Sequence, residues 1–94
     1  MKKATINKDM INKKLALIIL EIGKIDIKDD DISLFSFKYN LSAELLVYIL
    51  LKASKEFGFE INDDFVISLG DYSFCNIVNS IINQVSNLEY ISTN

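Results

Sequence analysis

Residues 43–58 constrain the fold most, because they carry a long apolar run that closes on a phenylalanine and a glycine. Within this run, five apolar residues recur three or four positions apart: Leu46, Ile49, Leu50, Ala53 and Phe57. That spacing places them on one face of an α-helix. Gly58 follows, and glycine readily takes the left-handed conformation that ends helices. The sequence therefore predicts a helix from Ser42 or Ala43 to about Phe57, with these five residues facing a core.

Two other segments also have helical spacing. The first runs from about Asn7 to Ile22 and carries this apolar stripe: Ile11, Leu15, Ile18 and Ile22. Gly23 comes next and is predicted to end that helix in the left-handed conformation. The other segment is the last helix, which begins near residue 74, with Asp71 or Ser73 as its cap. Its inward stripe is Phe74, Ile77, Val78, Ile81 and Val85.

The stretches between these segments complete the predicted fold. Asn62 or Asp63 is expected to cap a short helical turn through Phe65 and Val66. Residues 24–40, "KIDIKDDDISLFSFKYN", are too long for a simple turn and too apolar to stay in solvent, so we expect a loop tucked against the helices. The prediction is an all-α bundle of three main helices and one short helix. It forms one domain over residues 1–94, with frayed tails at 1–6 and 88–94.

Composition excludes several kinds of functional site. The chain has no histidine and one cysteine, so it lacks an imidazole base, a Cys/His dyad and a cysteine-rich zinc site. The acidic run at residues 29–31 is not followed by the glycine and distal glutamate of a calcium-binding loop. We therefore expect no metal site and no enzymatic activity.

Charge and hydropathy argue against nucleic-acid and membrane partners. The net charge is -3, whereas a nucleic-acid binder normally presents a basic face. The longest apolar runs, Leu15–Leu20 and Leu45–Leu51, are far shorter than the ~20 residues that cross a bilayer. The unpaired Cys75 suits a reducing compartment. We expect a cytoplasmic protein.

The order of several landmarks resembles that of the acyl carrier proteins over about residues 10–85. "KEFGFEIND" at 55–63 is similar to the segment that closes the second helix of that family. "SLF" at 33–35 resembles the apolar anchor of its first loop, and "YSFCNIVNSII" at 72–82 its last helix. Gly23 matches the glycine that ends the first helix. The resemblance implies a four-helix bundle in which a serine at the start of the second helix carries 4′-phosphopantetheine.

The register of this resemblance decides whether the arm can be attached. A gapless alignment places Ala43 at the family's serine, Ser42 at the preceding aspartate and Asn40 at the earlier glycine. Alanine has no oxygen for the phosphodiester, and Ser42 is then a helix cap that contributes ~1 kcal/mol. A one-residue insertion within the helix would instead bring Ser42 into the attachment position. Both alternatives remain open, with no cofactor expected in the first and 4′-phosphopantetheine on Ser42 in the second.

The second helix also has more apolar residues than one core face needs. We expect Leu45, Tyr48 and either Leu51 or Val47 to point outward. With Glu44, these residues are the candidate partner-binding site. The alternative is that the first loop covers this outer face.

The resemblance implies function through protein–protein contact. We expect a docking protein of a specialised biosynthetic pathway, similar to the acyl carrier-related proteins of bacterial peptide-maturation (bacteriocin) systems. Its partners would then be biosynthetic or peptide-modifying enzymes. Two alternatives are a carrier loaded at Ser42 and a bacteriocin immunity or antitoxin-like helical binding protein.

Overall fold

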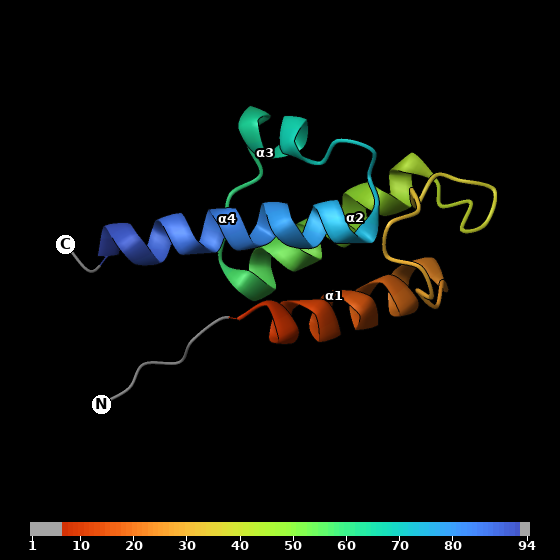
Figure 1. Cartoon of the computed structure of the whole chain (residues 1–94), viewed down its shortest axis with the longest axis horizontal. Helices are drawn as coiled ribbons and strands as arrows, with labels where there is room; N and C mark the ends of the chain where they lie inside the picture. The colour runs from red at the N-terminus through yellow and green to blue at the C-terminus, as the bar shows by residue number, and fades with distance from the viewer. Residues whose placement is uncertain (1–6, 93–94) are drawn as a thin grey trace.

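The structure, a computed structural model, describes residues 7–92, with side-chain surroundings described through residue 86. The described part is helical, without a β-strand (Figure 1). Its elements are α1 (Lys8–Gly23), α2 (Ala43–Phe57), α3 (Asp63–Ser68) and α4 (Phe74–Ser92). The all-α class and the arrangement of three main helices and one short helix are confirmed.

The ends of the chain extend beyond what the structure describes. Residues 1–6, expected to be a tail, lie outside the described residues, as do 93–94. In the other expected tail, α4 continues as far as Ser92. Among the described helices, none is long and apolar enough to cross a membrane.

The end of α1 differs by one residue from the prediction. Gly23 is the last helical residue, and Lys24 takes the left-handed conformation, with φ 58° and its N–H donating to the Leu20 carbonyl at 3.0 Å. Gly23 itself lies close to the start of α2. A Cβ built on it would lie 3.0 Å from Cδ1 of Leu41, where the chain returns to begin α2. The prediction that Gly23 takes the left-handed conformation is therefore wrong, because Lys24 takes it instead.

The start of α3 and the end of α2 follow the sequence. Gly58 ends α2 in the left-handed conformation, with φ 73°. Of the two candidate caps for α3, the structure uses Asn62, whose side-chain oxygen accepts a hydrogen bond from the Phe65 N–H at 2.9 Å.

At the start of α4, the two predicted cap residues act in succession. The Ser73 hydroxyl accepts from the Asn76 N–H at 3.2 Å, which makes Ser73 the cap. The Asp71 carboxylate accepts from the Ser73 N–H at 3.0 Å and from the Asn76 amide at 2.8 Å. These hydrogen bonds, first that of the Ser73 backbone, hold the pKa of Asp71 below its usual value.

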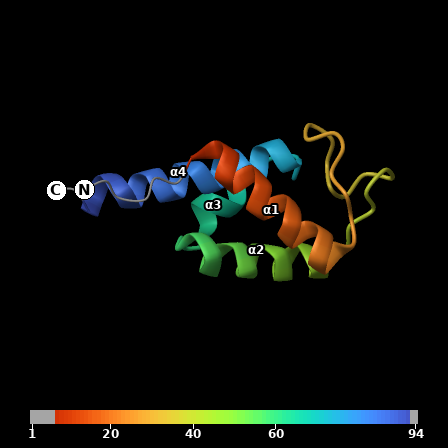
Figure 2. The ribbon, with the colours of Figure 1, turned by 90° about the horizontal axis from the view of Figure 1, so that it is seen from below.

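The core forms where α1 packs against both α2 and α4, and α3 packs against α4. Figure 2 shows α1 running from the side of α4 to that of α2. All ten residues predicted as the inward stripes of the second and last helices are buried: Leu46, Ile49, Leu50, Ala53, Phe57, Phe74, Ile77, Val78, Ile81 and Val85. The predicted helical faces are therefore correct.

Hydrogen bonds hold the first loop, residues 24–42, at several points, one of them from the Cys75 N–H to the Asp30 carbonyl at 2.7 Å. Leu34 is fully buried, and its N–H donates to the Tyr72 carbonyl at 2.9 Å. The buried Tyr39 hydroxyl accepts from the N–H groups of Lys28 and Asp29, at 2.9 and 2.7 Å. The expected tucked loop is confirmed for these residues, although Phe37 between them is fully exposed.

Candidate functional site: an apolar groove between α2 and α3

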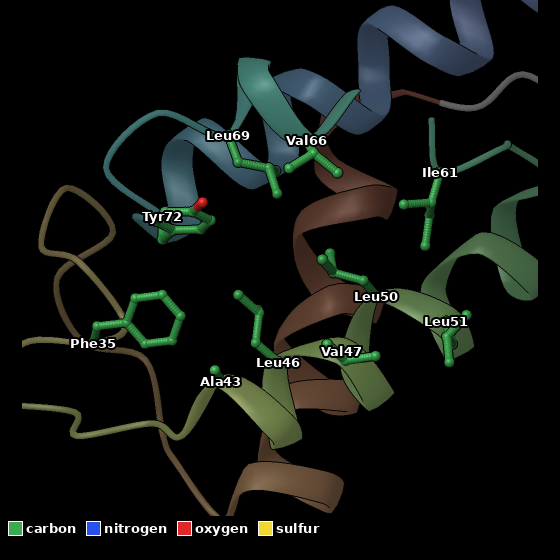
Figure 3. Close-up of a pocket in the computed structure, with 10 residues that line it drawn as sticks. All are labelled: Phe35, Ala43, Leu46, Val47, Leu50, Leu51, Ile61, Val66, Leu69 and Tyr72. Atoms are coloured by element: carbon green, nitrogen blue, oxygen red, sulfur yellow. The ribbon is translucent and has the colours of Figure 1, made fainter. Parts of the chain in front are cut away.

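An apolar groove of about 510 Å³ separates α2 from α3 (Figure 3). It is lined by Phe35, Ala43, Leu46, Val47, Leu50, Leu51, Ile61, Val66, Leu69 and Tyr72. We call this set the α2–α3 groove. Four separate segments contribute to it: the first loop, α2, α3 with its preceding turn, and the turn before α4.

The wall of the groove from α2 follows from helical spacing. Ala43, Val47 and Leu51 lie four residues apart, so they form one ridge along the helix. Leu46 and Leu50 form a second row and are only 5% and 7% exposed, as part of the core. The same helix therefore provides a buried base for the groove and a half-exposed rim.

An aromatic pair lies at one end of the groove. The rings of Phe35 and Tyr72 are 5.0 Å apart between centroids and tilted by 50°. The backbone fixes this pair, because Tyr72 has a positive φ of 62° and its carbonyl accepts the hydrogen bond from Leu34. The other end is flanked by Leu51 and Ile61 (Figure 3).

Ser42 and Ala43 have separate positions at the start of α2. The Ser42 hydroxyl caps the helix and accepts from the Leu45 N–H at 3.2 Å. It is exposed and is not part of the groove lining, whereas the methyl group of Ala43 is. Asn40 has a left-handed backbone with φ 50°.

The four residues predicted as a partner site differ in their surroundings. Leu51, 48% exposed, lines the α2–α3 groove, and Glu44 is exposed beside Ala43. Tyr48 is 52% exposed and lines a second hollow, which Leu51 also borders. Leu45, expected to point outward, is partly buried and packs against the core. The first loop leaves the outer face of α2 exposed at Val47, Tyr48 and Leu51.

The other groove residues were not predicted as a site, because they come from segments distant in sequence. One signal was present in the short helix: Phe65, Val66 and Ile67 are consecutive apolar residues, and only Phe65 is needed for the core. Val66 is 43% exposed and lines the groove, while Ile67 is 76% exposed. Val66, which follows the core residue Phe65, is the sequence signal that α3 forms the second wall of the groove.

The lining is suited to binding apolar groups. Nine of its ten side chains are hydrocarbon, and the phenol of Tyr72 is the tenth. Over the described residues, no three His, Cys, Asp or Glu side chains come together as a metal-binding group. Cys75 is half-buried outside the groove, and its Sγ contacts the Asn79 amide at 3.8 Å. The groove can therefore hold apolar surface.

Comparison with known proteins leaves this site to be interpreted from its geometry. No family model, curated protein or solved structure matches the chain.

Proposed function

We propose that this chain is a docking protein of the acyl carrier type that works without a phosphopantetheine arm. The observation that carries the proposal is Ala43, a residue without a hydroxyl, on the first turn of α2 and in the lining of an apolar groove. On this proposal, the groove and its rim are a recognition surface.

The residues at the start of α2 do not fit a tethered arm in the gapless register. The phosphodiester needs a side-chain oxygen, and Ala43 has none. The neighbouring Ser42 hydroxyl already accepts the hydrogen bond of the helix cap. Ser42 therefore has a structural role that needs no arm, since a serine cap typically stabilises a helix by about 1 kcal/mol.

The exposed apolar side chains support docking. Val47, Leu51 and Val66 line the groove and remain 53%, 48% and 43% exposed. Apolar side chains exposed along a groove can be removed from water by the apolar groups of a partner, which is favourable. The landmarks shared with acyl carrier proteins favour a biosynthetic partner, such as a peptide-modifying enzyme.

Intact-mass measurement after co-expression with a phosphopantetheinyl transferase tests the proposal. We expect the chain to keep its unmodified mass, while an acyl carrier protein expressed with the same transferase gains the phosphopantetheinyl group. The control variant is Ser42→Ala. Addition of one phosphopantetheinyl group that this substitution abolishes would replace the proposal by a carrier loaded at Ser42.

A further inference from the structure

Charge is divided unevenly between the α2–α3 groove and the rest of the chain. Helix α2 and residues 60–72, which supply nine of the ten lining residues, contain six carboxylates and two lysines. The remaining residues contain seven carboxylates and eight lysines. The walls of the groove thus carry a formal charge of -4 and the remainder +1, which together give the net charge of -3. Five of the six wall carboxylates belong to Glu44, Glu60, Asp63, Asp64 and Asp71.

These carboxylates are close in sequence to the residues that line the groove, and all five are exposed. Glu44 follows Ala43, Glu60 precedes Ile61, and Asp71 precedes Tyr72. The other two lie in the first turn of α3, before Val66. An apolar groove with carboxylates on its wall segments favours a partner with apolar side chains and positive charge.

The dimensions of the groove favour a helix over a single alkyl chain. Ala43 and Leu51 are eight residues apart on α2, which is about 12 Å at 1.5 Å per residue, or two turns of a docked helix. A thin alkyl chain on Leu46 and Leu50 would leave the half-exposed rims at Val47 and Val66 in water. An amphipathic helix, about 10 Å in diameter, presents a row of side chains and can cover more of this exposed apolar surface than a single alkyl chain.

We infer that the α2–α3 groove binds an amphipathic helix whose apolar stripe is flanked by lysine or arginine residues. This inference rests on the proposed docking function and specifies the chemistry of the partner. The apolar stripe lies in the groove, in the way that amphipathic helices occupy hydrophobic grooves. The flanking cations lie near the carboxylates of the two walls and orient the helix.

Fluorescence polarisation with synthetic helices tests the inference. The probe is a labelled 14-residue amphipathic peptide of leucine and lysine. Its counterpart has glutamate in place of every lysine. We expect the leucine/lysine peptide to bind more tightly by at least about tenfold, with affinity that falls as salt is raised, because exposed charges are screened.

Matched variants locate the binding. Val47→Lys places a cation in the groove rim and is expected to weaken the leucine/lysine peptide about tenfold. Leu17→Lys makes the same change at an exposed leucine of α1 outside the groove and should leave binding unchanged. Circular dichroism of both variants checks that the fold is intact.

A second pair of variants tests the charge. Glu44→Gln/Glu60→Gln should weaken the peptide about two- to tenfold, the range expected for two exposed charge pairs. Asp26→Asn/Asp31→Asn removes the same formal charge from the first loop and should have no effect. Equal weakening by the two double variants, or equal affinity for the two peptides, would overturn the inference.

Dodecanoate separates an alkyl-chain site from a helix site. We expect it to compete poorly with the bound peptide. If dodecanoate binds in a Val47-dependent way while neither peptide binds, the inferred partner is wrong. The docking function would then still be decided by the intact-mass measurement, because addition of a phosphopantetheinyl group overturns that function whatever the peptides do.

Discussion

At the scale of single residues, the two neighbours Ser42 and Ala43 have different roles at the start of α2. Ser42 supplies the hydroxyl that accepts the Leu45 N–H, and Ala43 supplies a methyl group to the groove. The sequence was sufficient to predict the cap, since a serine before an apolar helix is a common N-terminal signal. It could not show that the next residue borders a groove, because the opposite wall comes from α3.

Ser42→Ala should lower the free energy of unfolding by about 1 kcal/mol, because the Leu45 N–H loses its acceptor. Ser42→Asp should retain most of the stability, since aspartate is an equally good cap. Urea unfolding of the three proteins measures this. Equal stability of Ser42→Ala and the parent would show that the cap contributes nothing.

Asp71 should give stability that depends on pH. Its pKa is lowered from 3.8 in the folded state, chiefly by the hydrogen bond from the Ser73 backbone, so the folded state favours the carboxylate. This contribution is fully present above the unfolded pKa and is lost as pH falls through the lower folded value. Thermal unfolding between pH 6 and pH 2 should therefore show the parent losing its margin over Asp71→Asn below about pH 4. A margin that grows on acidification would contradict this assignment.

At the scale of elements, α2 shows what periodicity can predict and what it cannot. All five predicted core residues are buried, because helical spacing alone determines which side chains share a face. The outer residues were harder to place. Leu45 packs against the core, and Leu51 borders both the groove and the hollow that Tyr48 lines, since their surroundings depend on α1 and α3. The role of Gly23 was likewise missed, because the contact that it permits comes from Leu41.

Two substitutions in α2 should separate core from surface. Leu46→Ala removes a side chain that is only 5% exposed and should cost about 2–5 kcal/mol of stability. Tyr48→Glu changes a half-exposed residue and should alter stability by no more than about 0.5 kcal/mol. Chemical denaturation measures both values. A loss of several kcal/mol in Tyr48→Glu would mean that this tyrosine belongs to the core.

At the scale of the whole molecule, the first loop connects the core to the groove. Leu34 is buried and joined to the turn before α4, which brings the adjacent Phe35 against Tyr72. The sequence indicated an anchored loop through its apolar residues. It did not indicate that the anchor forms one end of a groove, because the two aromatic residues are brought together only in the folded chain.

Tyr39→Phe tests how firmly this loop is held. The Tyr39 hydroxyl accepts two backbone N–H groups, from Lys28 and Asp29, and the substitution leaves both without this acceptor. We expect a loss of about 1–3 kcal/mol in stability. Hydrogen exchange should also become faster at these two amides. Unchanged exchange at both would show that other contacts hold the loop.

The central claim is that this molecule acts through its α2–α3 groove. Backbone amide chemical shifts, recorded as the leucine/lysine helix is added, test it most directly. We predict that the largest changes fall within residues 43–51 and 60–72, with little change around Leu17 on α1. Changes concentrated on α1, or spread evenly over all the lysine-bearing segments, would contradict the account.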